Sequence, residues 1–310
     1  MLSRRNIRIK VLQTLYMMGR DPKITKQDAL KFYVDSLDRS QELYLLNLLY
    51  LIKTTEFALE DTERKKTKYL PSEEDKKFSA KLYENSVIQA LLKEDDLMLL
   101  FKKKRLGEYL DEDTNRKYYK TFAKTSEYKD YVYRGEGDKA HRNILLSLYK
   151  HLVKDEYYQE TMEDHFTSWE DDKSLIIGAI KKTIKALPDS PELYRIFRPD
   201  YEASIEFGET LLEKVIDTNE DLEKLIAPSL ENWEMDRVAN IDMILLKMAL
   251  CEFLDFQSIP TKVTLNEYVE VSKVYSTDKS KDFINGVLDK LMKTLADSGK
   301  INKEGRGLQD

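Results

Sequence analysis

Few residues of this 310-residue chain have the types and spacing that catalysis needs. The most enzyme-like pattern is a G-x-G-x-x-A spacing at residues 135–140, which follows a strand-like stretch at residues 131–133. A dinucleotide site needs this turn inside a βαβ unit, where the helix N-terminus meets the pyrophosphate. No alternation of strands and helices surrounds it, so we interpret it as the glycine-rich start of a surface helix.

Metal ligands are also poorly arranged. Asp111, Asp113 and Asn115 begin like a calcium loop. Arg116 then occupies the position of the required glycine and Phe122 that of the bidentate glutamate, which excludes such a loop. Three histidines and one cysteine do not supply a zinc motif. We therefore predict no metal and no cofactor.

Nucleophilic and acid–base catalysis finds no support either. Asp138 and His141 form a carboxylate-x-x-His pair, but a di-metal helix bundle needs more than one such unit. Cys251 lies in a mostly apolar run, which is typical of a small buried side chain. We predict that the chain is not an enzyme.

Charge indicates a different kind of function. The chain has 51 Lys+Arg against 57 Asp+Glu, a formal net charge of −6. Residues 1–20 differ from this balance because they contain no acid and five basic residues: Arg4, Arg5, Arg8, Lys10 and Arg20. Such a cluster fits phosphate contacts, but the solvated face of an amphipathic helix has the same composition. Charge alone leaves both interpretations open.

The elements that must position these residues are helices. With 10 Gly and 7 Pro, the chain has too few breakers for an all-β fold of tight turns. Its 35% charged residues suit amphipathic helices with solvated outer faces. Ser3 can cap a first helix over residues 3–19, with Ile7, Val11 and Leu15 on one side. We predict an all-α fold.

Three further signals concern boundaries and location. Pro188, Pro191 and Pro199 form the strongest linker signal in the chain. Thr264 and Glu267 have the spacing of a capping box, which predicts a helix start at Thr264. No apolar stretch reaches the roughly 20 residues of a membrane span, and the N-terminus lacks a signal-peptide core. We expect a cytoplasmic protein without membrane contact.

Two segments together resemble one known family. Residues 4–16 are similar to the arginine-rich opening helix of the transcription antitermination factor NusB, which ends in R-x-x-[apolar]-x-Q-x-L-Y. Residues 245–253 resemble the family's L-R-x-A-x-y-E-L helix. Residues 259–275 and 278–289 resemble P-x-x-V-x-I-N-E-x-V-E-L-A-K-x-Y and E-K-S-x-x-F-V-N-G-V-L-D. The resemblance covers about residues 1–20 and 200–297.

The resemblance implies a fold of two small helical bundles that catalyses no reaction. It implies binding to the boxA element of nascent ribosomal RNA leader transcripts together with NusE, a small-subunit ribosomal protein. The pair would join an RNA polymerase complex that reads through terminators. Members of the family can also pair through their RNA-binding face, so a homodimer is a further expectation.

Site residues follow from the resemblance by position. Arg4, Arg5 and Arg8 match RNA-contacting arginines, whose role would be charge-assisted hydrogen bonds to phosphates. Phe283 matches an aromatic position near the RNA, where an exposed ring would stack on an unpaired base. Lys279 lies in the adjoining loop and would add a phosphate contact.

The surface for NusE also follows by position. Tyr16 and Asp242 match positions linked to that surface. Tyr16 and Phe283 also fit apolar helix faces, so a place in the core stays open for both. Asn6 replaces one arginine of the family's run, which predicts weak salt dependence of RNA binding.

NusB proteins are usually about half as long as this chain. We therefore predict a NusB-like helical bundle core with a large additional helical region, divided as follows: 1–20, first helix of the core; 21–199, helical insertion or extra lobe of unknown role; 200–298, C-terminal core; 299–310, mobile tail. The residues after the first helix are expected to lean acidic, and an acidic insertion could mask the RNA face.

Two alternatives to antitermination remain. One is a non-catalytic helical protein-interaction scaffold with reduced RNA binding, which the negative net charge favours. The other is a module of an RNA cytosine methyltransferase. That enzyme would need a cofactor-binding α/β domain and a catalytic cysteine, and the sequence offers neither.

Overall fold

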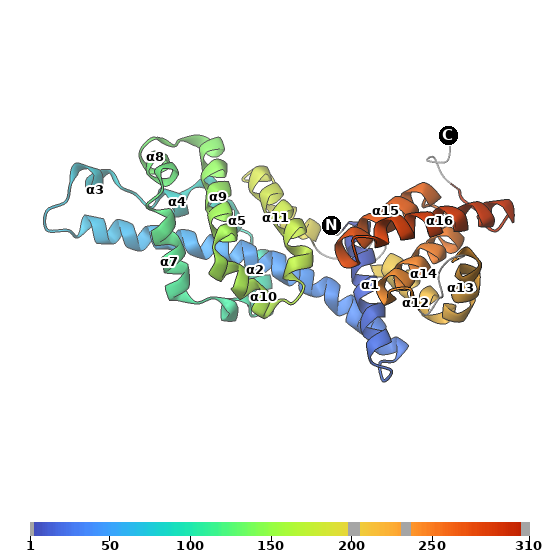
Figure 1. Cartoon of the computed structure of the whole chain (residues 1–310). Helices are drawn as coiled ribbons and strands as arrows, with labels where there is room; N and C mark the ends of the chain where they lie inside the picture. Colours follow the sequence, from blue (N-terminus) through green and yellow to red (C-terminus); the bar gives the residue numbers. More distant parts are fainter. Residues whose placement is uncertain (1–2, 198–204, 231–236, 305–310) are drawn as a thin grey trace. The chain divides into compact units, whose positions relative to one another are not determined.

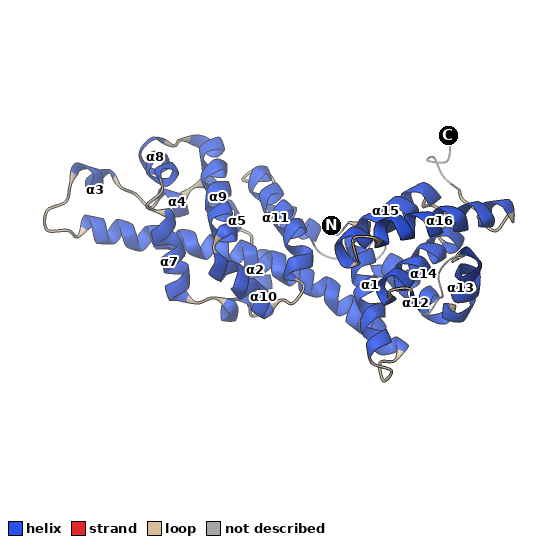
Figure 2. Cartoon of the chain, viewed as in Figure 1, coloured by secondary structure: helices blue, strands red, loops and turns tan. Residues whose placement is uncertain are grey.

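A computed structural model describes residues 3–197, 205–230 and 237–304 of the chain. Within these ranges every regular element is a helix (Figure 2), so the predicted all-α class is confirmed. None of the described helices is long and apolar enough to cross a membrane. The chain divides into two compact units, coloured by sequence in Figure 1.

The first unit, here called the split unit, consists of Leu2–Leu37 and Pro199–Asp310. Its central helix is α14, because most of its side chains are buried and five other helices contact it. A helix that is apolar on all sides must be enclosed in this way. The elements are α1 (Arg4–Arg20), the first part of α2 (Lys26–Lys66), α12 (Phe207–Asp217), α13 (Asn219–Ile226), η4 (Ala227–Ser229), α14 (Asn240–Asp255), α15 (Thr261–Tyr275) and α16 (Ser280–Asp297).

Helix α1 forms as the sequence predicts. The Ser3 side chain accepts a hydrogen bond from the Asn6 amide and caps the helix. Ile7, Val11 and Leu15 lie in the core. The predicted capping box at Thr264 is wrong, because α15 already begins at Thr261. The side chain of Thr264 instead bonds to another helix, as described below.

The beginning of α2 also belongs to the split unit. Its Tyr33 is buried against α12, where Gly208 leaves room for the ring. A Cβ atom built on Gly208 would lie 2.0 Å from the Tyr33 hydroxyl, so no other residue fits without movement. Residues 21–37, which the sequence assigned to the insertion, therefore pack with the core helices.

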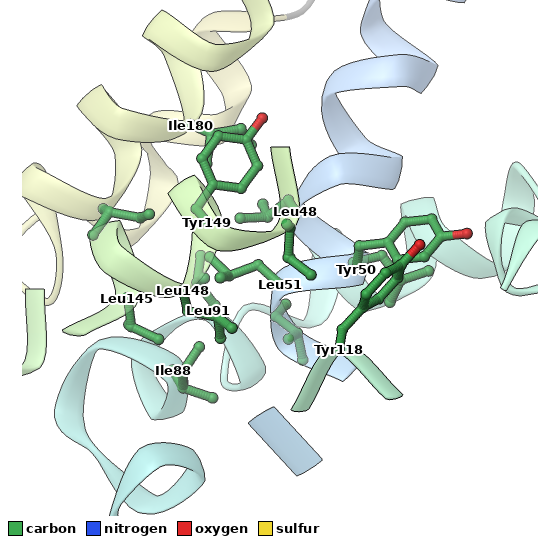
Figure 3. Close-up of a cluster of buried hydrophobic side chains, with 14 of the residues drawn as sticks. Leu48, Tyr50, Leu51, Ile88, Leu91, Tyr118, Leu145, Leu148, Tyr149 and Ile180 are labelled. Carbon is green, nitrogen blue, oxygen red and sulfur yellow. The ribbon is translucent and has the colours of Figure 1, made fainter. Parts of the chain in front are cut away.

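The second unit, here called the inserted unit, is Asp38–Arg198. Its core is rich in tyrosine and surrounds the middle of α2 (Figure 3). Besides α2 it contains α3 (Glu73–Lys77), α4 (Lys81–Glu84), α5 (Ser86–Leu92), α6 (Asp95–Lys103), η1 (Leu106–Tyr109), α7 (Glu112–Phe122), α8 (Ser126–Arg134), α9 (Gly137–Lys154), α10 (Glu156–His165), α11 (Trp169–Ala186) and η2 (Pro191–Phe197).

A neutral hydrogen-bond network lies inside this core. The Asn47 side-chain oxygen accepts from the hydroxyls of Tyr149 and Tyr158, each at 2.8 Å. The Asn47 amide nitrogen donates to the Leu43 carbonyl at 2.8 Å. Because buried polar groups are costly when unpaired, this network explains how a core can enclose several tyrosines.

The charge of the two units differs from expectation. Residues 38–198 carry 30 Lys+Arg and 31 Asp+Glu, so the inserted unit is close to neutral. The acid excess lies in the split unit, with 21 Lys+Arg against 26 Asp+Glu. The prediction that the insertion is acidic is therefore wrong.

Part of the predicted mobile tail makes defined contacts. The Lys303 ammonium donates to the backbone carbonyls of Glu252 and Phe256, at 2.6 and 2.8 Å. The backbone amide of Glu304 donates to the Gln257 carbonyl. Residues 299–304 thus pack against the end of α14, and residues 305–310 lie outside the described residues.

Candidate functional site

The first turn of α1 presents two arginines to solvent. Arg4 is exposed, and its guanidinium carbon lies 5.6 Å from the centre of the Phe207 ring of α12. Arg5 donates two hydrogen bonds to Glu267 of α15, at 2.8 and 2.9 Å, and keeps 47% of its side chain exposed. Both guanidinium groups are accessible to an anionic ligand.

The Arg5–Glu267 pair holds both groups in their charged form. Its hydrogen bonds raise the pKa of Arg5 and lower the pKa of Glu267. The cost for ligand binding is that a phosphate must compete with Glu267 for Arg5. Arg4 has no such competitor among the described residues.

Arg8 lies in a different environment from its neighbours. Its side chain is 2% exposed, and it donates to both carboxylate oxygens of Glu252 on α14, at 2.6 and 2.8 Å. Burial is the largest single effect and disfavours the charge, but the hydrogen bonds to Glu252 and the nearby negative charges together raise the pKa of Arg8. Its predicted role as a phosphate contact does not fit, because the guanidinium has no access to solvent.

Glu252 is the centre of this buried cluster. The Tyr268 hydroxyl donates to one carboxylate oxygen at 2.7 Å, and the Thr264 hydroxyl donates to the other at 3.1 Å. Burial, with the charge of Glu252 nearby, raises the pKa of Tyr268. The cluster joins α1, α14 and α15, and so fixes the helix that carries Arg4 and Arg5.

The sequence itself contains a signal for this buried cluster. Arg8 falls on the same helix side as the buried Leu12 and Leu15, and Glu252 interrupts an apolar run. A cation on one apolar helix face and an acid on another are typical of a buried ion pair.

The other end of α1 meets the beginning of α14. A Cβ atom on Gly19 would lie 4.0 Å from the Asn240 side-chain nitrogen. Tyr16 is half-buried, and its hydroxyl accepts from Arg20 at 2.8 Å. Asp242 is buried and accepts from the Ser280 hydroxyl at 2.8 Å. The two positions predicted for NusE contact thus lie at one end of the unit.

Lys279 and Phe283 lie near this second end. Lys279 is the exposed N-cap residue of α16, and Phe283 is half-buried in the first turn of that helix. Ser280 next to Lys279 bonds to Asp242, ten residues before Glu252 on α14. At 1.5 Å per residue, Asp242 and Glu252 are about 15 Å apart along α14. The structure therefore separates Lys279 and Phe283 from the arginines.

The C-terminal region is similar to known proteins. Residues 196–293 match the model of the NusB family. We call this stretch, which matches the family over about a third of the chain, the NusB domain. A transcription antitermination protein NusB of Salinibacter ruber is 43% identical over 103 residues, which are 33% of this chain and 64% of the relative. No solved structure matches the chain.

Two further relatives have the same name. The NusB protein of Chloroherpeton thalassium is 41% identical over 100 residues, 32% of this chain and 47% of the relative. That of Listeria monocytogenes is 40% identical over 83 residues, 27% of this chain and 65% of the relative. The chain thus covers less than two thirds of each relative. Helix α1 lies outside the family match, and the Arg8–Glu252 pair connects it to the NusB domain.

The remaining candidates for chemistry are the cysteine and the potential metal ligands. Cys251 is buried in α14, and burial raises the pKa of its thiol to about 12. Among the described residues, no group of three His, Cys, Asp or Glu could hold a metal ion. The relatives are named for a role in transcription antitermination.

Proposed function

We propose that this protein is an RNA-binding transcription antitermination factor of the NusB type. The family match of residues 196–293 carries the proposal. The protein binds boxA-type RNA together with NusE and joins the RNA polymerase antitermination complex. It acts by binding and catalyses no reaction.

The RNA surface proposed here is smaller than the one inferred from sequence. It consists of Arg4 and Arg5, whose guanidinium groups can donate to phosphate oxygens. Arg8 is not part of this surface. Its buried pair with Glu252 holds α1 in place against α14. Lys279 and Phe283 form a separate contact near Asp242, which lies about 15 Å along α14 from Glu252.

The NusE surface is proposed at the Tyr16 end of α1. Tyr16 is accessible there, whereas the Asp242 carboxylate supports the start of α16 through Ser280. Asp242 would then shape the surface and not contact NusE directly. A homodimer through the RNA face would bury Arg4 and Arg5 and compete with RNA.

A binding titration tests the proposal. Fluorescent boxA-like RNA is titrated with the full chain, with and without NusE, at two salt concentrations. We expect saturable binding that NusE strengthens. The double variant Arg4→Ala/Arg5→Ala should bind more weakly, with a salt slope smaller by about 1.4, since each phosphate contact on a single strand contributes about 0.7.

The matched control is Lys23→Ala/Lys31→Ala, which removes two exposed cations of the same unit. Its affinity for boxA-like RNA should stay close to that of the wild type. Absence of binding even with NusE would reject the proposal in favour of the protein-interaction scaffold. Equal losses in both double variants would reject the proposed role of Arg4 and Arg5.

A further inference from the structure

Three helices of the inserted unit combine into a surface that the NusB match does not cover. Residues 114–126, 139–154 and 173–188 contain no Asp or Glu, although the unit has 31 acids. Each segment contains four Lys or Arg residues. They form most of α7, α9 and α11, respectively, which lie one after another along α2 (Figure 1).

Side-chain contacts place α9 between the other two helices. The Thr121 hydroxyl of α7 is 2.9 Å from the His151 ring nitrogen of α9. On the opposite side of α9, Val153 shares a surface hollow of about 680 Å³ with Ile177 and Lys181 of α11, and Glu163 and Glu170 also line this hollow. The three acid-free segments are therefore neighbours in space.

The contacts also give the helix directions. Arg142, early in α9, donates to the carbonyl of Leu187, just beyond the end of α11. Val153, late in α9, meets Ile177 in the middle of α11, so these two helices are antiparallel. Helix α9 buries Ile144, Leu148 and Leu152. Its opposite side carries Asn143, Ser147, Lys150 and Lys154, at helical spacing.

Six lysines cover the outer side of this layer, and together we call them the basic face: Lys117, Lys120, Lys124, Lys150, Lys154 and Lys181. All six are exposed, and none forms an ion pair with a described residue. Acids lie at the ends of the segments, at Asp113, Glu127 and Asp155, and Glu163 and Glu170 line the hollow beside Lys181. The charge of the other five lysines is open to a polyanionic ligand.

We propose that the basic face binds the sugar–phosphate backbone of RNA without sequence preference. The inference takes from the proposed function only that RNA is the ligand, and it gives the inserted unit a role of its own. Six exposed ammonium groups match a chain of phosphates and release its counterions.

The composition of the face favours RNA over a protein partner. Lysine is depleted in protein–protein interfaces, which rely on aromatic and large apolar anchors. The large exposed apolar side chains of the described residues, such as Tyr69, Leu70 and Leu99, lie outside α7, α9 and α11. A face of lysines without such anchors fits a polyanion.

A pair of charge-matched triple variants tests this inference. Lys120→Gln/Lys150→Gln/Lys154→Gln removes half of the basic face. Lys93→Gln/Lys102→Gln/Lys103→Gln removes three exposed lysines at or near α6 that also lack ion pairs. Both are made in the full chain and checked by circular dichroism and thermal melting. The probe is fluorescein-labelled 30-nucleotide oligouridylate, titrated by anisotropy between 50 and 200 mM NaCl.

We expect the basic-face variant to bind oligouridylate roughly tenfold more weakly at the lowest salt, with a slope smaller by about 2. The α6 variant should stay close to the wild type. Equal losses in both variants, an unchanged basic-face variant, or no oligouridylate binding by the wild type would each overturn the inference.

The same titrations separate this inference from the proposed function. The preference for boxA-like over scrambled RNA tests the NusB domain and should survive in the basic-face variant. Loss of oligouridylate binding with the preference intact supports both proposals. Oligouridylate binding through the basic face in a protein without any boxA preference supports the inference and rejects the proposed function.

Discussion

The split unit and the inserted unit enclose polar groups in different ways. The split unit buries a full ion pair, Arg8–Glu252, at 2.6 Å. The central network of the inserted unit is neutral, with two tyrosine hydroxyls on Asn47, and the buried Asp172 elsewhere in this unit accepts from two serine hydroxyls. A neutral network needs only its hydrogen bonds, whereas an ion pair must also offset the desolvation of two charges. The buried charge therefore depends more strongly on each partner.

The positions of these groups in the chain sharpen the contrast. Arg8 and Glu252 are 244 residues apart, and their pair joins the first helix to the NusB domain. Asn47 and its tyrosines belong to one continuous segment. In the split unit buried charge specifies which distant helices meet. In the inserted unit the lysines of the basic face remain at the surface.

The largest effect is expected when the buried pair loses its cation. Arg8→Met leaves Glu252 buried without a countercharge and should lower the free energy of unfolding of the split unit by about 3–5 kcal/mol. Amide hydrogen exchange should show lost protection in α14 peptides and unchanged protection in α9 peptides. Arg4→Met, on the exposed side of α1, is the control. A loss no larger than in this control would contradict the contrast between the units.

A smaller effect is expected in the neutral network. Asn47→Leu removes the acceptor of two buried hydroxyls and should cost about 1–3 kcal/mol of unfolding free energy, seen in α9 peptides by hydrogen exchange. The triple variant Asn47→Leu/Tyr149→Phe/Tyr158→Phe removes the unpaired hydroxyls and should recover part of this loss. Tyr157→Phe, at a half-exposed ring, is the control. Without recovery in the triple variant, the network explanation fails.

Two glycines compare the packing of the units directly. Gly208→Ala should destabilise the split unit by about 1–3 kcal/mol, because its Cβ meets the Tyr33 ring. Gly178→Ala on α11 has open space around the new Cβ and should stabilise the inserted unit by about 0.5–1 kcal/mol. Urea unfolding of both variants measures the difference. If both variants changed the free energy of unfolding in the same direction, the close contact at Gly208 would not explain the effect of the new Cβ atom.

The smallest effect concerns the surface pair Arg5–Glu267. The folded protein has a lowered pKa for Glu267, so the pair adds stability above the unfolded glutamate pKa of about 4.3 and loses it as the pH falls through the folded value. Glu267→Gln should therefore be less stable than the wild type at pH 7 and equal to it at low pH. Thermal melting across pH measures this convergence. High salt should reduce the difference, since the pair is partly exposed.

Local chemistry in the sequence was enough for the helical class and the first helix. It failed where tertiary contacts decide the outcome. The pattern from Ser72 to Lys104 predicts one long helix, but the structure has four short ones, α3 to α6, with the Asn85 side chain capping α5. Thr264 and Glu267 read as a capping box because sequence alone could not reveal their partners on α14 and α1.

The candidate site divides in the same manner. Position in the family pattern identified Arg4, Arg5 and Arg8 as a group. Arg8 is nevertheless buried, although it lies only one helical turn after the exposed Arg4 and Arg5. The sequence did not predict the basic face, because its lysines come from three segments that are unremarkable one at a time. Only the packing of α7, α9 and α11 brings them together.

The discontinuity of the split unit has a consequence during protein synthesis. At about 5–20 residues per second, the 244 residues between Arg8 and Glu252 take roughly 12–50 s to translate. The inserted unit is complete before α14 leaves the ribosome and can fold first. Until then α1 exposes its apolar side and an unpaired Arg8. Helix α1 is thus made long before the helices that enclose it.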